Sequence, residues 1–147
     1  FAAANKKYGA TTVAGTMIIA RKAGIKIFVT GGIGGVHRGY NETMDMSADI
    51  IELSKTPVAV VCAGIKSILD IPRTLESLET HGVPVISYKT KEFPSFFSPS
   101  SGIQSPMHVN SVEEIAKVVD ASFSLGMENG ILIAVPNQNS YDGNVEA

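Results

Sequence analysis

The sequence predicts a single α/β domain, a layered α/β/α sandwich around a mainly parallel or mixed sheet. Short apolar runs typical of buried strands alternate with segments of helical periodicity, and such alternation is typical of a parallel sheet covered by helices on both faces. The chain has 147 residues, of which 44% are hydrophobic. This is enough for one domain with its own core, so we expect residues 1–147 to fold as one unit.

The composition excludes several classes of function. A formal net charge of −2 offers no broad basic surface for a nucleic-acid polymer, although a small nucleotide needs only a local site. No apolar stretch approaches the roughly 20 residues of a membrane span, and no signal peptide opens the chain. The single cysteine, Cys62, lies in an apolar run, where we expect a buried, unreactive thiol. These features are typical of a cytoplasmic protein, while an organelle address in a preceding segment stays open.

The first half of the chain contains two predicted helices and one predicted strand. Apolar and small residues recur at helical spacing over 12–23, between threonines that can cap the start and a glycine that can close the end. Residues 25–30 form a β-branched and aromatic run that stops at two glycines, as a buried strand does. A glycine-rich loop over 31–39 and a short apolar helix over 47–54 follow.

The second half alternates in the same way. The sequence predicts strands over 57–63, 84–88 and 130–135. Between the first two we expect a helix over 67–81, in which Pro72 marks either a kink or the true start.

A loop over 89–108 contains three prolines, and loops of that length are often lids. A capping box that starts at Ser111 opens another helix, which ends near Gly126. The tail after Pro136 is polar and rich in turn formers.

Lys66 is the main candidate for chemistry. It follows the strand over 57–63 after a glycine turn, and we expect a helix to begin at Ser67. A buried strand and a helix N-terminus both disfavour a positive charge, so they should favour the neutral, nucleophilic amine. The alternative is an ordinary exposed lysine at a turn. Ligands of parallel sheets gather at the carboxyl ends of the strands, which favours the catalytic interpretation.

The glycine-rich segment 31–39 matches neither of the common nucleotide motifs. The last glycine of the dinucleotide fingerprint is replaced by His37, and Gly64-Ile-Lys-Ser67 has one residue too many for a P-loop. Clustered glycines can still bring N–H groups close to a phosphate or carboxylate. His37 and Arg38 suit a phosphate or a carbonyl oxygen. The alternatives are a flexible turn and a solvated surface.

Asp45, Ser47 and Asp49 form a second polar group. If Ser47 caps the short helix, its hydroxyl and the first N–H groups can bind an anion, while Asp45 can reach a hard cation. One carboxylate does not make a complete cage, but it suits a partly hydrated Mg²⁺ or Mn²⁺ shared with a substrate. The alternative is that Asp45 or Asp49 only caps the helix.

Several segments of this sequence, taken together and in order from residue 9 to residue 134, resemble one family. The resemblance is to the pseudouridine-5′-phosphate glycosidase family, also described as indigoidine-synthase-A-like. The matching segments are 9–13 (Gly-Ala-Thr-Thr-Val), 29–39 (Val-Thr followed by the glycine-rich segment), 45–49 (Asp-Met-Ser-Ala-Asp), 56–58 (Thr-Pro-Val), 62–70 (Cys-Ala-Gly-Ile-Lys-Ser-Ile-Leu-Asp) and 74–80 (Thr-Leu-Glu-Ser-Leu-Glu-Thr).

The resemblance implies a homotrimeric, Mn²⁺-dependent enzyme that reversibly cleaves the carbon–carbon bond between uracil and ribose 5-phosphate. By this resemblance Lys66 is the nucleophile on the sugar C1′ and Asp45 is the metal ligand. The expected substrate-binding residues are Val13, Ser47, Ala48 and Asp49, to which we add His37. An amine that opens the ribose and forms an imine supplies an electron sink, and a general acid must protonate the departing uracil.

The sequence departs from the family at both ends. Family members extend before Phe1, and the resemblance places the proton-donating glutamate and a phosphate-binding lysine there. We therefore expect this chain to be the C-terminal part of a longer glycosidase and to depend on the missing N-terminal segment. Residues 134–140 replace the usual Ala-Asn-Pro run, so no substrate contact is carried over there. Two alternatives stay open: a non-catalytic phosphosugar-binding fragment, and a lysine-imine lyase acting on another phosphosugar.

Overall fold

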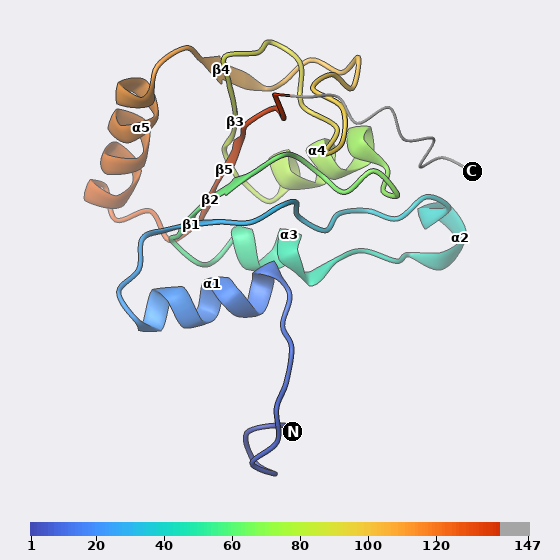
Figure 1. Cartoon of the computed structure of the whole chain (residues 1–147), viewed down its shortest axis with the longest axis vertical. Helices are drawn as coiled ribbons and strands as arrows, with labels where there is room; N and C mark the ends of the chain where they lie inside the picture. Colours follow the sequence, from blue (N-terminus) through green and yellow to red (C-terminus); the bar gives the residue numbers. More distant parts are fainter. Residues whose placement is uncertain (139–147) are drawn as a thin grey trace.

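A computed structural model describes residues 1–138 and shows a five-stranded sheet in which all neighbouring strands are parallel. The strand order is β1-β2-β5-β3-β4, so the last strand of the chain lies at the centre of the sheet (Figure 1). The strands are β1 (Ile27–Val29), β2 (Ala59–Cys62), β3 (Val85–Tyr88), β4 (Met107–Val109) and β5 (Ile131–Ala134). The helices are α1 (Val13–Lys22), α2 (Tyr40–Thr43), α3 (Ala48–Leu53), α4 (Ile71–Thr80) and α5 (Val112–Ser124).

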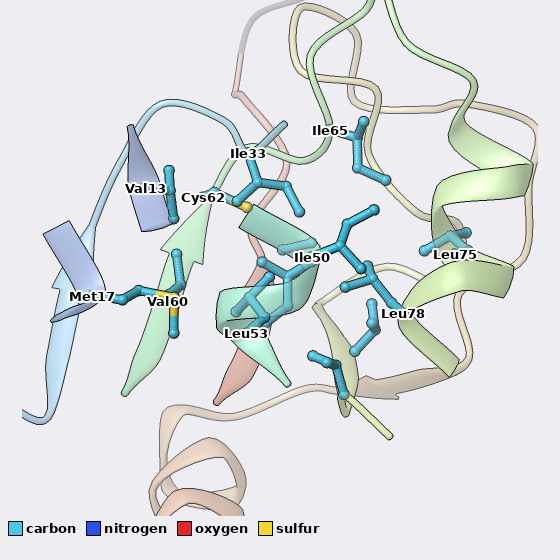
Figure 2. Packing of buried hydrophobic residues seen from close by; sticks show 14 of the residues in the cluster. Val13, Met17, Ile33, Ile50, Leu53, Val60, Cys62, Ile65, Leu75 and Leu78 are labelled. Carbon is cyan, nitrogen blue, oxygen red and sulfur yellow. The ribbon is translucent and has the colours of Figure 1, made fainter. Parts of the chain in front are cut away.

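The helices form two layers around the sheet, which confirms the predicted sandwich. Alternate residues of β2 point to opposite faces: Val60 and Cys62 pack into a cluster with α1, α3 and α4, while Ala59 packs with α5. Figure 2 shows the larger cluster, in which Met17 of α1, Ile50 and Leu53 of α3 and Leu75 and Leu78 of α4 meet. Each fully buried Leu or Ile in it contributes roughly 1.5–3 kcal/mol to folding.

Local sequence signals explain where the helices begin. Ser47 caps α3 by accepting a hydrogen bond from the N–H of Asp49. Asp70 caps α4 by accepting one from the N–H of Arg73. At Ser111 both reciprocal bonds of the predicted capping box with Glu114 are present, and backbone hydrogen bonds lower the pKa of that exposed carboxyl.

Four expectations need correction. The strand expected to be buried over 25–30 is β1, whose residues Ile27 and Val29 are exposed in the described structure because no residue of β1 lies in the cluster under α5. Helix α4 begins at Ile71 rather than at Ser67, because Asp70 caps it and Pro72 lies in its first turn, as the alternative start near Pro72 predicted. The end of the predicted 89–108 loop contains the short strand β4. One helical turn, α2, interrupts the segment between the glycine-rich loop and α3.

Residues 139–147, including most of the polar tail, lie outside the described part. Within residues 1–138 no helix is long and apolar enough to cross a membrane.

Candidate active site

The glycine-rich segment is an extended strand-like segment rather than a flexible turn. It runs parallel to the chain after β2 and continues the pairing of β1 with β2. The N–H of Ala63 donates to the carbonyl of Gly31 at 2.9 Å, and the N–H of Ile33 donates to that of Gly64 at 3.1 Å. The N–H of Lys66 then donates to the carbonyl of Ile33 at 3.2 Å. These bonds fix Lys66 beside the glycines.

Close packing explains why this segment needs glycine. A Cβ on Gly34 would collide with Ser47, and one on Gly35 would collide with Thr74. At Gly32 a Cβ would lie 2.6 Å from the ring of Phe96. The glycines therefore let α3, α4 and the proline-rich loop approach the segment.

Several N–H groups of the segment are already used inside the protein. The N–H of Gly34 donates to Asp49, that of Val36 donates to Oγ1 of Thr74, and that of His37 donates to the carbonyl of Asp45. The expectation that the glycines present their N–H groups to an anion is therefore wrong at Gly34, and the N–H groups of Val36 and His37 are engaged as well. Arg38 is likewise engaged, since its guanidinium donates to the carbonyl of Ser67 at 3.1 Å.

Asp49 joins two elements of the site. Its side chain is buried, and its two oxygens accept hydrogen bonds of 2.8 Å from the N–H groups of Ala14 and Gly34. The first donor lies in the first turn of α1, where the helix dipole favours a negative charge. Asp49 thus holds the start of α1 against the glycine-rich segment.

Lys66 lies where two cavities meet. One cavity has a volume of about 320 Å³ and the other about 350 Å³. Both are lined by Lys66 together with Thr11, Thr12 and Val13 at the start of α1. The Lys66 side chain is exposed, and among residues 1–138 its amine has no hydrogen-bond or ion-pair partner. The burial that the sequence predicted for this side chain is absent, and no helix begins at Ser67, since α4 begins at Ile71.

The two cavities differ in the side chains that line them. The first has an aromatic wall formed by Phe28 and Phe96, with Thr16 and Thr30 beside it. The second is lined instead by His37, Ser47 and Asp49, with Ile68 and Leu69 beside them. A larger cavity of about 640 Å³ lies between α4 and residues 103–107, but none of the candidate residues lines it. Chemistry rather than volume therefore identifies the site.

The N-terminus of α1 supplies hydrogen-bond donors to both cavities. The first N–H groups of a helix have no intrahelical partner. The N–H of Ala14 is satisfied by Asp49, whereas the side chain of Thr12 makes no capping bond and the N–H of Val13 has no acceptor in the described region. The hydroxyls of two threonines and a helix N-terminus next to an amine can bind a phosphate.

Asp45 and His37 lie side by side at the rim of the second cavity. His37 Nδ1 is 3.8 Å from Asp45 Oδ2, and the Asp45 side chain is 62% exposed. Within the described region no three His, Cys, Asp or Glu side chains gather at one point. These two residues fit a largely hydrated ion with one or two protein ligands, and they do not form a closed metal cage.

The structure brings most of the predicted site residues together. Val13, His37, Ser47, Asp49 and Lys66 all line the second cavity. Ala48 and Asp45 line neither cavity; Ala48 is exposed at the start of α3, and Asp45 reaches the second cavity only through its contact with His37.

Among the lining residues that sequence reasoning missed are Thr11, Thr12 and Phe96. The sequence did contain a signal for each of them. The threonines were expected as helix caps, and Phe96 lies in the loop over 89–108, which was expected to be functional.

Cys62 is close to the site in sequence but takes no part in it. Its side chain is buried in the core, and desolvation raises the pKa of its thiol to about 11. A neutral buried thiol is a poor nucleophile, so the expected inert role is confirmed in structural terms.

A comparison with known families matches almost the whole chain. The profile of the family described as "Indigoidine synthase A like protein" aligns with residues 1–146. The chain belongs to the indigoidine synthase A-like family. Membership confirms the resemblance drawn from the glycine and lysine motifs.

Curated members of the indigoidine synthase A-like family are close in sequence. A pseudouridine-5′-phosphate glycosidase of Alkaliphilus metalliredigens is 58% identical over 133 residues, which are 90% of this chain and 43% of that protein. Another from Caldanaerobacter subterraneus subsp. tengcongensis is 59% identical over 132 residues, with the same coverage of 90% and 43%. The chain therefore spans less than half the length of these relatives.

Solved members of the family share the fold. The prealnumycin C-glycosynthase AlnA, described in complex with ribulose 5-phosphate, aligns with a TM-score of 0.86 and 40% identity over 90% of this chain and 44% of that one. An indigoidine synthase A-like protein of Thermotoga maritima aligns with a TM-score of 0.84 and 39% identity, over 92% and 45%.

Proposed function

We propose that this chain carries the nucleophile of a pseudouridine-5′-phosphate glycosidase, which cleaves pseudouridine 5′-phosphate reversibly to uracil and ribose 5-phosphate. The observation that supports this most is the position of Lys66, at the junction of two cavities and next to the N-terminus of α1. The names of the curated relatives support the same substrate.

In the proposed reaction, neutral Nζ of Lys66 attacks C1′, and the bond from C1′ to the ring oxygen breaks, which opens the ribose. The ring oxygen leaves with the electron pair of that bond and takes up the proton that the nitrogen loses. The nitrogen lone pair then forms a C1′=N bond while the C1′–C5 bond breaks, and uracil leaves with that electron pair and a proton gained at C5. Water hydrolyses the imine, which releases ribose 5-phosphate and restores the amine. The proposal takes the proton donor from a part of the enzyme outside this chain, as the family resemblance implies.

Residues of this chain would orient the substrate. The N–H of Val13 and the hydroxyls of Thr11 and Thr12 suit the phosphate, because they are donors at the positive end of a helix. Asp49 would keep those donors in place through Ala14. Asp45, with His37, would hold a hydrated Mn²⁺ or another hard divalent ion, which would supply positive charge near the substrate. Assembly as a homotrimer and dependence on an N-terminal segment are part of the same proposal.

Borohydride trapping tests the proposal. With ribose 5-phosphate, reduction should attach the sugar covalently to Lys66, as peptide mass spectrometry would show. Lys66→Ala should abolish the adduct, while Lys55→Ala, a lysine paired with Glu52 away from the cavities, should not.

Two other outcomes would replace the proposal. Binding of ribose 5-phosphate without any adduct would indicate a non-catalytic phosphosugar-binding protein. An adduct with ribulose 5-phosphate alone, the ligand named for the solved C-glycosynthase, would indicate a lyase or synthase for another phosphosugar.

A further inference from the structure

The amine of Lys66 depends on the backbone around it for its position. Its side chain is exposed, and among residues 1–138 its Nζ has no hydrogen-bond or ion-pair partner. Residues 63–70, which we call the lysine loop, connect β2 to α4 (Figure 1). A displacement of about 1 Å from the reacting geometry can lower a rate by roughly 100-fold. The main chain of the lysine loop must therefore be held firmly if Lys66 is to react.

The start of the lysine loop is held by the extended sheet pairing. The N–H of Lys66 donates to the carbonyl of Ile33 at 3.2 Å. Beyond this bond the loop turns, since the N–H of Leu69 donates back to the carbonyl of Lys66 at 3.0 Å. The exposed guanidinium of Arg38, which donates to the carbonyl of Ser67, holds the turn only weakly because water competes for it. The turn needs a second anchor at its far end.

A closed ring of three hydrogen bonds supplies that anchor. Oγ1 of Thr74 donates to the carbonyl of Asp70 at 2.7 Å. The N–H of Asp70 donates to the carbonyl of Val36 at 2.9 Å. The N–H of Val36 donates back to Oγ1 of Thr74, also at 2.9 Å. One hydroxyl, acting as donor and acceptor at once, thus joins the end of the lysine loop, the glycine-rich segment and α4.

The hydroxyl of Thr74 is not needed to begin α4. The carbonyl of Asp70 also accepts from the N–H of Thr74 at 3.0 Å, and the Asp70 carboxylate caps the helix through the N–H of Arg73. The distinctive partner of the hydroxyl is the N–H of Val36, which would be left without an acceptor in the interior because Thr74 is fully buried. A Cβ on Gly35 would collide with this hydroxyl, so the glycine provides the space in which the ring closes.

We propose that Thr74 is a positioning residue for the reaction of Lys66. Through its ring with Val36 and Asp70, its hydroxyl holds the lysine loop so that Nζ of Lys66 is placed to attack C1′. Thr74 lines neither cavity, so it acts through the backbone and not on the substrate. This role rests on the proposed function, because it requires Lys66 to be the nucleophile.

The rate of borohydride trapping with saturating ribose 5-phosphate tests this role. Thr74→Val keeps the branched shape of the side chain and removes the hydroxyl, and it should slow adduct formation at Lys66 by about tenfold or more. Binding is measured separately with ribitol 5-phosphate, which has no aldehyde and cannot form an imine, and its dissociation constant should change by less than about twofold. Thr74→Ser keeps the hydroxyl and should restore most of the rate.

Two further variants separate positioning from a general loss of stability. Gly35→Ala disturbs the ring from the other side and should show the same selective loss of rate. Val119→Ala leaves a cavity in the cluster on the opposite face of the sheet, so it should destabilise the fold without changing the rate.

An unchanged rate in folded Thr74→Val or in folded Gly35→Ala would overturn the positioning role and leave the proposed function standing. Equal losses of rate in Thr74→Val and Val119→Ala would also overturn it, because stability alone would then explain both. Absence of an adduct in the natural chain itself would instead contradict the proposed function, and the role of Thr74 would fall with it.

Discussion

Asp49 shows how a single buried side chain organises the candidate site. Its two oxygens are both needed, because each faces an N–H group from a different part of the chain. The sequence predicted a possible cap at this position but not the partners, since Ala14 and Gly34 are 35 and 15 residues away. Sequence spacing reports neighbours on one element, whereas contacts between elements depend on how the elements pack.

Asp49→Asn should therefore destabilise the protein. The amide that replaces the carboxylate has a single acceptor oxygen, so it can accept from only one of the two backbone N–H groups. Its NH₂ group then faces the other N–H, and that buried donor is left unpaired. We expect a loss of about 1–3 kcal/mol in the free energy of unfolding, measured by urea titration. Asp45→Asn is the control, and a change within about 0.5 kcal/mol is expected because that side chain is 62% exposed. Similar losses for both variants would show that the two hydrogen bonds do not carry the effect.

At the scale of elements, local signals predicted most starts and ends correctly. The capping box at Ser111 is formed within four residues, so sequence alone was sufficient there. β4 was missed because three residues at the end of a proline-rich loop give no clear alternation. The position of that loop could not be predicted from the sequence either. Phe96 adopts a left-handed backbone conformation, with φ of 66°, and its ring packs over Gly32.

Two neighbouring glycines test this packing. Gly32→Ala would place a methyl group 2.6 Å from the Phe96 ring and 3.1 Å from the carbonyl of Gly64, so the loop must move. We expect a loss of about 1–3 kcal/mol in thermal unfolding and faster protease cleavage within residues 89–106. Gly31→Ala should be tolerated, because its methyl group would meet the same ring at 3.6 Å, an ordinary contact. If both variants are cleaved at the same rate, Phe96 does not depend on the glycine beneath it.

At the scale of the whole molecule, the sequence predicted the layers but not the order of the strands. Alternating helices and strands indicate a parallel sheet, whereas two connections cross over a neighbouring strand, so β5 enters between β2 and β3. The site follows from this order, because the ends of β1 and β2 lie side by side and bring Lys66 next to the glycine-rich segment. The sequence identified several motifs as polar loop residues, but only the folded structure shows that they line two cavities.

The stability of the whole fold should depend on pH through Cys62, which lies in the core on β2. Burial raises the pKa of this thiol from its ordinary value near 9.0 to about 11. Between those values the unfolded chain loses the proton while the folded chain keeps it, so stability falls as pH rises and is unaffected below about pH 8. The expected loss from this group is on the order of 2–3 kcal/mol by pH 11. Urea unfolding in a reducing buffer at several pH values, compared between the natural chain and Cys62→Ala, isolates the contribution of the thiol from those of other groups. If the free energy of unfolding changes with pH in the same way in both proteins, the thiol reaches water before the fold opens.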